Sequence, residues 1–357
     1  MKHPVLFGAA PLGAGSGEAE ALSGFFARIS LCRFLKPSYA LRHFVLPRMT
    51  HRLPHDQPSV SLGPLVSHAN RIDLRPDIAL PFASVLEELT ALPSLGRHMF
   101  AVTAHLWPSH YRFSLGTPQK KWCPVCLAGS AGGTVYEQLV WRFALVERCP
   151  LHLCRLVDRC SVCGERQRLL PRCVPIGYCD CCGHRLVDGD PGLPIEEKEL
   201  DVRERWALWR SIAISRLVAW SSRCDPSELK VDFRGYARLL QSVSTAAPHS
   251  GTPSRLGLEI ALGLTGPAAF EQGLAGSAPS LEAIVDVSMQ LGVDPVRVLS
   301  GQFRSGERTW PPKDTSLLPC EDPWTLGVQV RNLSTTLRHR ESRFSEHSAE
   351  SSPRLVD

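Results

Sequence analysis

The feature that most constrains this chain is a dense group of cysteines near the middle of its 357 residues. The run CSVCGERQRLLPRCVPIGYCDCCG, from Cys160 to Gly183, holds six cysteines in 24 residues. Just upstream, KWCPVCL and CPLHLC add four cysteines and a histidine. Such a group is typical of a disulfide framework, a redox device, a catalytic metal centre or a structural metal site. The choice among these four decides how this part of the chain folds.

The compartment in which the chain works bears on that choice. No run approaches the roughly 18 apolar residues that a membrane-spanning helix needs. The start, MKHPVLFGAAPLGAGSGEAEA, has a short apolar stretch, but prolines and glycines interrupt it, and a polar segment stands where a signal peptide would be cleaved. We therefore expect a cytoplasmic protein. In a reducing cytoplasm, clustered CxxC pairs favour metal ligands over disulfides.

The spacing of the cysteines indicates zinc. A structural zinc ion takes four thiolate or imidazole ligands in a tetrahedron, usually as two close pairs joined by a loop. Such pairs occur four times. A loop of 22 residues joins the first two pairs, and a loop of 15 residues joins the last two. Gly164 and Gly183 follow two of the pairs, where a tight turn favours a residue that tolerates positive φ. The pattern predicts two structural zinc ions, the first held by Cys123, Cys126, Cys149 and His152, the second by Cys160, Cys163, Cys179 and Cys182.

The remaining cysteines leave alternatives open. Cys154, Cys173 and Cys181 could replace a ligand, and CDCC leaves the register of the last pair ambiguous. Pairing Cys179 with Cys182 keeps the CxxC geometry and is preferred. Three isolated cysteines (Cys32, Cys224 and Cys320) are expected to be buried or free thiols.

A catalytic metal centre needs an open coordination position for water or substrate. Both predicted sites are filled by four protein ligands. The sequence contains no HExxH or HxE…PCxxC pattern to supply a general base, no GxxxxGK[ST] phosphate loop and no GxSxG elbow. A zinc hydrolase would need such a base, and no residue presents itself. We expect a protein that is not an enzyme, whose zinc ions stabilise a small fold.

The flanking segments are helical by their apolar periodicity. From Glu18 to Val45, one face carries Leu22, Phe25, Phe26, Ile29 and Cys32. A second helical block, residues 79–106, is split at Pro93 and Gly96. Helical spacing returns at residues 202–220 and in DFRGYARLLQSV, with core positions at Trp206, Trp209, Ile212 and Leu217.

These patterns predict a mainly α-helical fold with small zinc-ribbon (zinc-knuckle) insertions. We expect an N-terminal helical region over 10–120, tandem zinc-binding ribbons over 121–190, and a C-terminal helical domain over 195–303. Residues 304–357 are rich in Ser, Pro, Arg and Glu, and we expect a disordered tail because they offer little apolar surface to bury.

The formal charge is +4 over residues 1–119, +3 over 120–190 and −2 over 191–357. A mildly basic cysteine region suits contact with nucleic acid or an acidic partner, although a solvated basic face is the plain alternative. The basic residues expected to make such contacts are Lys120, Lys121, Arg142, Arg148, Arg155, Arg159, Arg166, Arg168 and Arg172.

In order and spacing, these motifs resemble the signature of the TniQ/TnsD family. That signature is a CPxCL knuckle, a Trp-Arg helix, a CPxH knuckle and two CxxCG knuckles. Its counterparts here are Cys123 to Leu127, Trp141–Arg142, Cys149 to His152, Cys160 to Gly164 and Cys179 to Gly183. The segment GEAEALSGFFARIS also resembles the family's opening helix, with Glu18, Ser23 and Arg28 near the usual Glu, Ser and Arg. The resemblance covers roughly residues 10–190, about half the chain.

The resemblance implies a role rather than a reaction. Such proteins are accessory factors of bacterial transposons with a heteromeric transposase. They select or mark target double-stranded DNA and recruit the transposon's AAA+ ATPase regulator, which in turn engages the transposase; they work at the nucleoid. Some relatives instead join an RNA-guided CRISPR effector, and the motif leaves that partner open.

A second resemblance lies in residues 254–301, which are similar to a helix-turn-helix of the repressor type. PSLEAIVDVSMQLGVDPVRVL supplies the two later helices, with Leu281, Ile284, Val285 and Leu291 as core. The helix placed for the major groove, PAAFEQGLAG, offers Gln272 as its one amide and no Arg or Lys. DNA contact through this element and a helical domain for protein contact or dimerisation both stay open.

Two functions from different classes therefore compete. The first is a transposition accessory protein for target-site selection. The alternative is a stand-alone, zinc-stabilised DNA-binding transcriptional regulator, which a sequence-specific operator preference without any transposon partner would favour.

Overall fold

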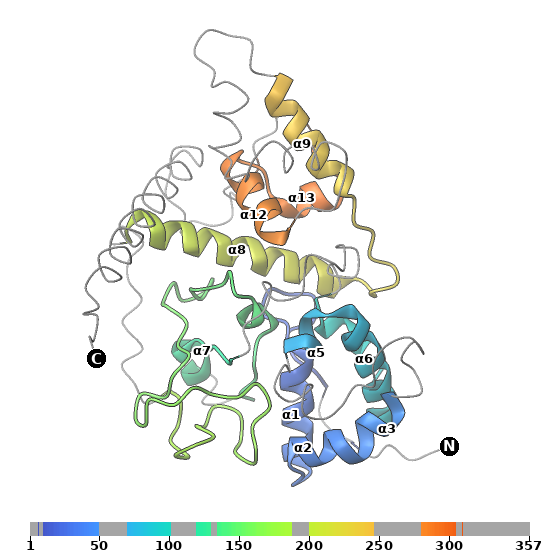
Figure 1. Ribbon diagram of the computed structural model, residues 1–357, viewed down its shortest axis with the longest axis vertical. Coiled ribbons are helices and arrows are strands. Elements are labelled where there is room, and N and C mark those ends of the chain that lie inside the picture. Colours follow the sequence, from blue (N-terminus) through green and yellow to red (C-terminus); the bar gives the residue numbers. More distant parts are fainter. Residues whose placement is uncertain are drawn as a thin grey trace, which may run out of the picture.

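A computed structural model of the chain describes residues 6, 10–49, 70–100, 119–129, 134–187, 200–245, 280–304 and 309. These residues form helices and irregular loops, and the β contacts among them are isolated bridges rather than strands. An N-terminal group of helices lies beside the cysteine-rich loops, and the long helix α8 (Val202–Arg223) crosses above both (Figure 1). A smaller C-terminal group of helices covers the other side of α8. The mainly helical class predicted from the sequence is confirmed for this part of the chain.

The N-terminal lobe packs around two facing helices. Its elements are α1 (Leu22–Cys32), α2 (Pro37–Ala40), the π-helix η1 (Leu41–Val45), α3 (Leu46–Met49), α5 (Asn70–Leu74), α6 (Pro76–Thr90) and the 3₁₀ helix η2 (Leu95–His98). Phe26 of α1 meets Phe82 of α6 edge to face, with ring centroids 5.4 Å apart. Leu169 and Leu170, from the loop of the second cysteine cluster, join this core. The cysteine region and the helical lobe are thus packed together.

The single helix expected from Glu18 to Val45 is interrupted. It begins at Leu22, ends at Cys32 and starts again at Pro37, because Phe34 takes a left-handed conformation (φ 57°) and Pro37 has no N–H to continue a helix. The thiol of Cys32, expected on the apolar face, is exposed at the end of α1. The predicted break in the second helical block is confirmed, since α6 ends at Thr90 before Pro93.

The cysteine-rich region holds only two short helices among the described residues, α7 (Pro124–Gly129) and the 3₁₀ helix η6 (Leu139–Arg142). The sequence suggested short strands here. Pairing is limited to isolated bridges, because each turn around a cysteine pair closes after one bridging residue on either side.

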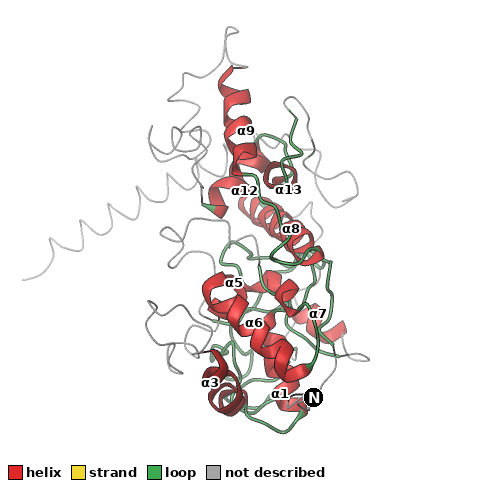
Figure 2. Cartoon of the chain, turned by 90° about the vertical axis from the view of Figure 1, so that its right-hand side faces the viewer, coloured by secondary structure: helices red, strands yellow, loops and turns green. Residues whose placement is uncertain are grey.

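Helix α8 begins with a capping box: Asp201 accepts from the backbone N–H of Glu204, whose side chain accepts from the backbone N–H of Asp201. Figure 2 shows α8 between the cysteine-rich region and the C-terminal helices. Because it has neighbours on both sides, it is buried on more than one face. Of its predicted core positions, Trp206, Trp209, Ile212 and Leu217 are all buried, and they join one continuous core with side chains from both neighbours.

The C-terminal group consists of α9 (Phe233–Thr245), α12 (Leu281–Gln290) and α13 (Pro295–Leu299). Ser280 and Asp294 cap α12 and α13, at the two helices expected for the end of a helix-turn-helix. Their predicted core residues Leu281, Ile284 and Val285 are buried, whereas Leu291 is half-buried. The earlier helix pair, with Gln272, lies outside the described residues, as does the tail beyond 304 apart from Thr309.

Two arginines of α8 hold α12 and α13. Arg210 makes a bidentate pair with Asp286, and Arg216 pairs with Asp294 at 2.6 Å.

Across the residues that the structure covers, no helix has both the length and the apolar content needed to cross a bilayer.

Candidate metal centres

The first cysteine cluster brings together the four predicted ligands from two turns. The ligand atoms of Cys123, Cys126, Cys149 and His152 all lie within 4.8 Å of one another. His152 Nδ1 is 3.5 Å from Cys123 Sγ, 3.2 Å from Cys126 Sγ and 3.6 Å from Cys149 Sγ. Cys126 and Cys149 are 3.7 Å apart between sulfurs. No pair of sulfurs stands at the bonding distance of a disulfide, about 2 Å.

These distances fit a tetrahedron around one ion. A zinc ion with Zn–S bonds of about 2.3 Å and a Zn–N bond of about 2.1 Å sets sulfurs about 3.8 Å apart and a sulfur and nitrogen about 3.6 Å apart. In the first cluster, His152 Nδ1 lies 3.2 to 3.6 Å from the three sulfurs, and the sulfurs of Cys126 and Cys149 are 3.7 Å apart. Thiolate and imidazole ligands in this number suit zinc better than hard cations such as Mg²⁺ or Ca²⁺.

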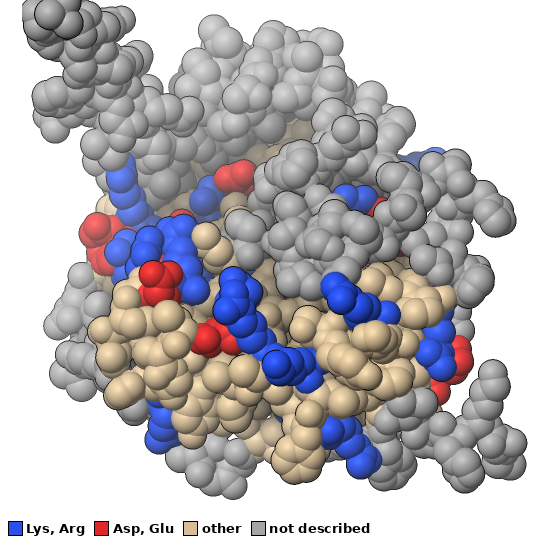
Figure 3. Space-filling view, turned by 60° about the horizontal axis from the view of Figure 1, so that its bottom comes forward, with Lys and Arg blue, Asp and Glu red and all other residues tan. Residues whose placement is uncertain are grey.

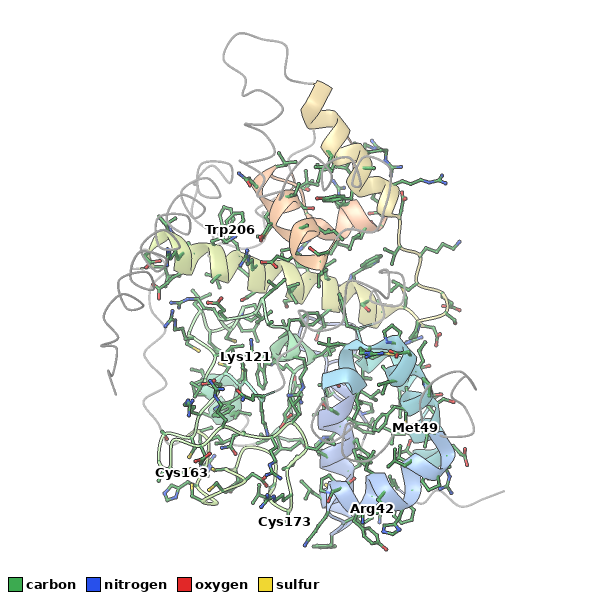
Figure 4. All side chains as sticks on the ribbon, viewed as in Figure 1. Arg42, Met49, Lys121, Cys163, Cys173 and Trp206 are labelled. Carbon is green, nitrogen blue, oxygen red and sulfur yellow. The ribbon has the colours of Figure 1, made fainter. Side chains whose placement is uncertain are left out.

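The second cluster has the same proportions and four sulfurs. Cys160 and Cys182 lie 3.7 Å apart and Cys163 and Cys179 3.6 Å apart, and all four sulfurs fall within 4.8 Å. Cys163 lies at the outer edge of the cysteine-rich loops, away from α8 (Figure 4). This cluster is more exposed than the first, since Cys160 and Cys179 are buried but Cys182 is exposed. Two clusters able to bind metal are therefore present, with the ligand sets that the spacing predicted.

Three of the four ligand pairs sit in the same local turn. In each, the residue after the pair donates its N–H to the carbonyl of the first cysteine and takes positive φ: Leu153 at 58°, Gly164 at 71° and Gly183 at 74°. An isolated bridge closes each turn, between Arg148 and Arg155, Arg159 and Arg166, and Tyr178 and Arg185. The need for positive φ, predicted at the two glycines, is confirmed; Leu153 meets it without a glycine.

Hydrogen bonds from nitrogen to sulfur help to orient the ligands. The N–H of Cys126 donates to Cys123 Sγ at 3.3 Å, and Gln167 Nε2 donates to Cys179 Sγ at 3.2 Å. Burial raises the pKa of Cys179, but hydrogen bonds from the backbone N–H groups of Cys182 and Cys181 lower it by more. The resulting pKa is about 6. A thiol with that pKa is largely thiolate at neutral pH, which is the form that binds metal.

The three cysteines that were alternative ligands differ in burial. Cys154 is buried with its sulfur 3.4 Å from Cys123 Sγ, so a fourth sulfur lies at the edge of the first cluster. Cys173 and Cys181 are exposed. The Cys179–Cys182 pairing is the one that brings four sulfurs together in the second cluster.

A buried network of charges joins the helical lobe to the first cluster. Arg142 of η6 is fully buried and pairs with Asp73 of α5 and with Glu137. Ser23 of α1 donates to Asp73 at 2.6 Å, and Lys120 pairs with Glu137. Burial raises the pKa of Asp73, more than its contacts with Arg142 and Ser23 lower it. For Glu137, ion pairing with Lys120 and Arg142 outweighs burial, and its pKa is lowered.

A second pair lies beside this network. Arg28 contacts Glu20 with two nitrogens, at 2.8 and 2.7 Å. The sequence suggested Glu18 as the acidic member of the opening helix, but Glu20 is the residue that Arg28 reaches. His98 Nδ1–H donates to the carbonyl oxygen of Glu20, and burial lowers the pKa of His98 to about 4.

The structure corrects part of the predicted contact surface. Lys120, Arg142 and Arg148 are buried in internal ion pairs, the last with Glu204 of α8, so their side chains do not face a partner. Lys121 donates to the carbonyl oxygens of Phe143 and Val146 inside the cysteine-rich region (Figure 4), and burial lowers its pKa to about 8. The sequence alone does not tell which basic residues near a metal site are buried and which are exposed.

The other predicted contact residues in this region are exposed: Arg155, Arg159, Arg166, Arg168 and Arg172. Arg166 pairs with Asp158 at 3.3 Å. Arg155 lines a cleft of about 300 Å³ between the first cluster's turns and α8, together with Arg203 and Glu147.

Sequence reasoning missed the buried acids, Glu20, Asp73 and Glu137. No local pattern marks them, because Asp73 and Arg142 are 69 residues apart.

The described residues thus form a helical lobe that buried ion pairs join to the region of the Cys₃His cluster. The Cys₄ cluster comes next in the chain. Residues 11–156 match the TniQ family model, so the match spans the whole helical lobe and the first cluster. Residues 11–156 thus carry a TniQ domain, which supports the resemblance of this chain to the TniQ/TnsD family. No curated protein sequence matches the chain.

Proposed function

We propose that this chain is a non-catalytic accessory protein of transposition. In this proposal it binds or marks target double-stranded DNA and recruits the transposon's AAA+ ATPase regulator, and through it the transposase. The observation that carries the proposal is the TniQ domain over residues 11–156, which includes the helical lobe and the first metal cluster.

Both clusters act in this proposal as structural zinc ribbons. Cys123, Cys126, Cys149 and His152 would hold one zinc ion, and the four cysteines from Cys160 to Cys182 the other. Four protein donors fill a tetrahedral ion, so neither site leaves a position for a substrate. Zinc would supply folding free energy to loops that have no strand ladder of their own among the described residues.

The exposed arginines of the cysteine-rich region are the candidates for partner contact. Arg155 and Arg159 both lie in the short link between the two clusters, from His152 to Cys160, and both are exposed. Such side chains grip phosphates or acidic surfaces without reading sequence. The C-terminal helices α12 and α13 would belong to the helix-turn-helix, whose groove-facing residue would be Gln272.

The test is co-elution of the zinc-loaded chain with the AAA+ ATPase of the same locus, with and without duplex DNA. We expect binding, and we expect Arg155→Glu combined with Arg159→Glu to weaken it while zinc content stays the same. Lys230→Glu combined with Arg234→Glu, two exposed positions near α9, is the matched control.

No binding by a fully zinc-loaded chain would contradict the proposal. A sequence-specific operator preference in the absence of ATPase would then favour the stand-alone regulator.

A further inference from the structure

The turn after α1 and the two short elements that follow it form an exposed basic and aromatic surface. Its members are Arg33, Phe34, Lys36, Tyr39 and Arg42, all exposed, which we call the α1–η1 surface. Between Ala21 and Met49 the sequence contains no Asp or Glu. Nothing in this segment of the chain can therefore neutralise the surface.

The charges on the α1–η1 surface contrast with other basic residues of the same lobe. Arg28 is paired with Glu20 and Arg48 with Glu88. Lys36 and Arg42, in contrast, make no ion pair with any residue that the structure describes. Two positive charges therefore remain available for a partner.

Phe34 is the second observation. Helix α1 ends in a Schellman turn, in which the N–H of Leu35 bonds to the carbonyl of Ser30 and the N–H of Phe34 to that of Leu31. The position of Phe34 has φ 57° and usually takes glycine, because a side chain is disfavoured there. The ring is 100 % exposed, so it contributes no packing to the free chain.

Tyr39 extends the apolar part of this surface. Its ring is half exposed and lies 4.2 Å from the His43 ring and 6.2 Å from the Phe44 ring, measured between centroids. The surface thus presents a half-exposed aromatic ring, packed against two neighbouring rings, beside its charges.

The neighbouring loop adds positive charge at the same end of the molecule. Leu169 and Leu170 pack into the core of the helical lobe, and the residues on either side of them, Arg168 and Arg172, are exposed. Figure 4 labels Arg42 and Cys173 along this lower edge. In Figure 3, which brings that end forward, Lys and Arg side chains are spread across the visible face, and Asp and Glu lie beside some of them.

We infer that the α1–η1 surface binds duplex DNA. Lys36, Arg42 and Arg33 contact backbone phosphates, and Phe34 provides an apolar side chain that contacts sugars or wedges at a base step in the minor groove. The inference rests on the proposed function, and it adds a DNA-contact surface on the helical lobe, outside both metal clusters.

Basic residues with exposed aromatics also suit an anionic membrane surface. Membrane binding of this kind needs a helix with a wide apolar face open to the bilayer. Here the apolar residues Ala40, Leu41 and Val45 of α2 and η1 are buried in the core. Duplex DNA is thus the better match.

The test measures fluorescence anisotropy of a labelled random-sequence duplex with full-length, zinc-loaded protein, at salt between about 50 and 200 mM. Lys36→Ala combined with Arg42→Ala should weaken binding about tenfold and lower the slope of log affinity against log salt by about 2. Phe34→Gly should leave thermal stability unchanged or raised, weaken binding about threefold or more, and leave the salt slope unchanged. Lys230→Ala combined with Arg234→Ala is the control and should change affinity less than about twofold.

The outcomes separate the inference from the proposed function. If the wild-type chain binds no duplex DNA, both fail. If it binds and Arg155→Glu with Arg159→Glu weakens binding while the Lys36, Arg42 and Phe34 variants do not, the proposed function stands and this inference is overturned. The inference is also overturned if these variants lose binding to phosphatidylserine–phosphatidylcholine vesicles but not to the duplex.

Discussion

The buried guanidinium of Arg142 carries the most direct stability prediction. It belongs to a group of four charges whose sum is zero. Arg142 and Lys120 are positive, and Asp73 and Glu137 are negative. Arg142→Met removes one positive charge and leaves both carboxylates buried. Breaking a buried ion pair by removing one partner costs about 3–5 kcal/mol, because the remaining charge has lost its compensation. We expect a loss of that size in the free energy of unfolding at pH 7.

The loss should depend on pH. Burial already raises the pKa of Asp73 with Arg142 in place. Without Arg142 that pKa rises further, so the folded variant holds a proton that the unfolded chain releases. A raised carboxyl pKa means that the variant gains stability as pH falls through the folded-state value. The difference between wild type and Arg142→Met should therefore be smaller at pH 5 than at pH 7.

The assay is urea unfolding followed by tryptophan fluorescence, with zinc content checked in both proteins. Arg48→Met is the matched control, since Arg48 and Glu88 form an exposed pair worth at most about 1 kcal/mol. Adding Asp73→Asn to Arg142→Met should recover part of the loss, because it removes one uncompensated carboxylate. A loss below about 1 kcal/mol for Arg142→Met would refute the account of this network.

Three further predictions concern the clusters and the lobe beside them. Cys126→Ser and Cys163→Ser should each lose one zinc ion per chain by native mass spectrometry and unfold the local turn; two tightly bound zinc ions in both variants would show that the ligand assignment is wrong. Gly164→Ala should cost about 1–2 kcal/mol because of its positive φ, while Gly129→Ala, which has open space and no such φ, should not, as measured by urea unfolding. His98 has a folded pKa of about 4, below its unfolded value of 6.5, so the stability it contributes is complete above pH 6.5 and is lost as pH falls toward 4. Between pH 7 and pH 5 the wild type should lose about 2 kcal/mol through this group, and an unchanged pH dependence in His98→Gln would contradict that assignment.

The metal clusters could be predicted from sequence because their geometry is local. Two residues between ligands fix a turn, and the glycines after Cys163 and Cys182 mark where positive φ is needed. Helix α8 could also be predicted, since its core positions Trp206, Trp209 and Ile212 recur every three residues, a spacing that suits a helix.

The network around Arg142 could not be predicted in this way. Its acidic partners come from α5 and from the segment before η6, and only the packed structure brings them together. From sequence alone, Arg142 would be placed on the surface. In the structure its burial is compensated by Glu137, five residues away, and by Asp73, which is 69 residues away in the chain. The break at Phe34 was missed for a related reason, because the residue has no turn signature and the Schellman hydrogen bonds are made by the backbone.

We propose that this chain directs transposition without catalysing it. The most direct measurement is transposition in cells that carry the transposase and the AAA+ ATPase of the same locus, with and without this chain, followed by sequencing of all insertion sites. We predict that insertions at preferred target sites require the chain, and that Cys126→Ser fails to restore them. Equal insertion frequency and an unchanged distribution of sites in its absence would contradict the account.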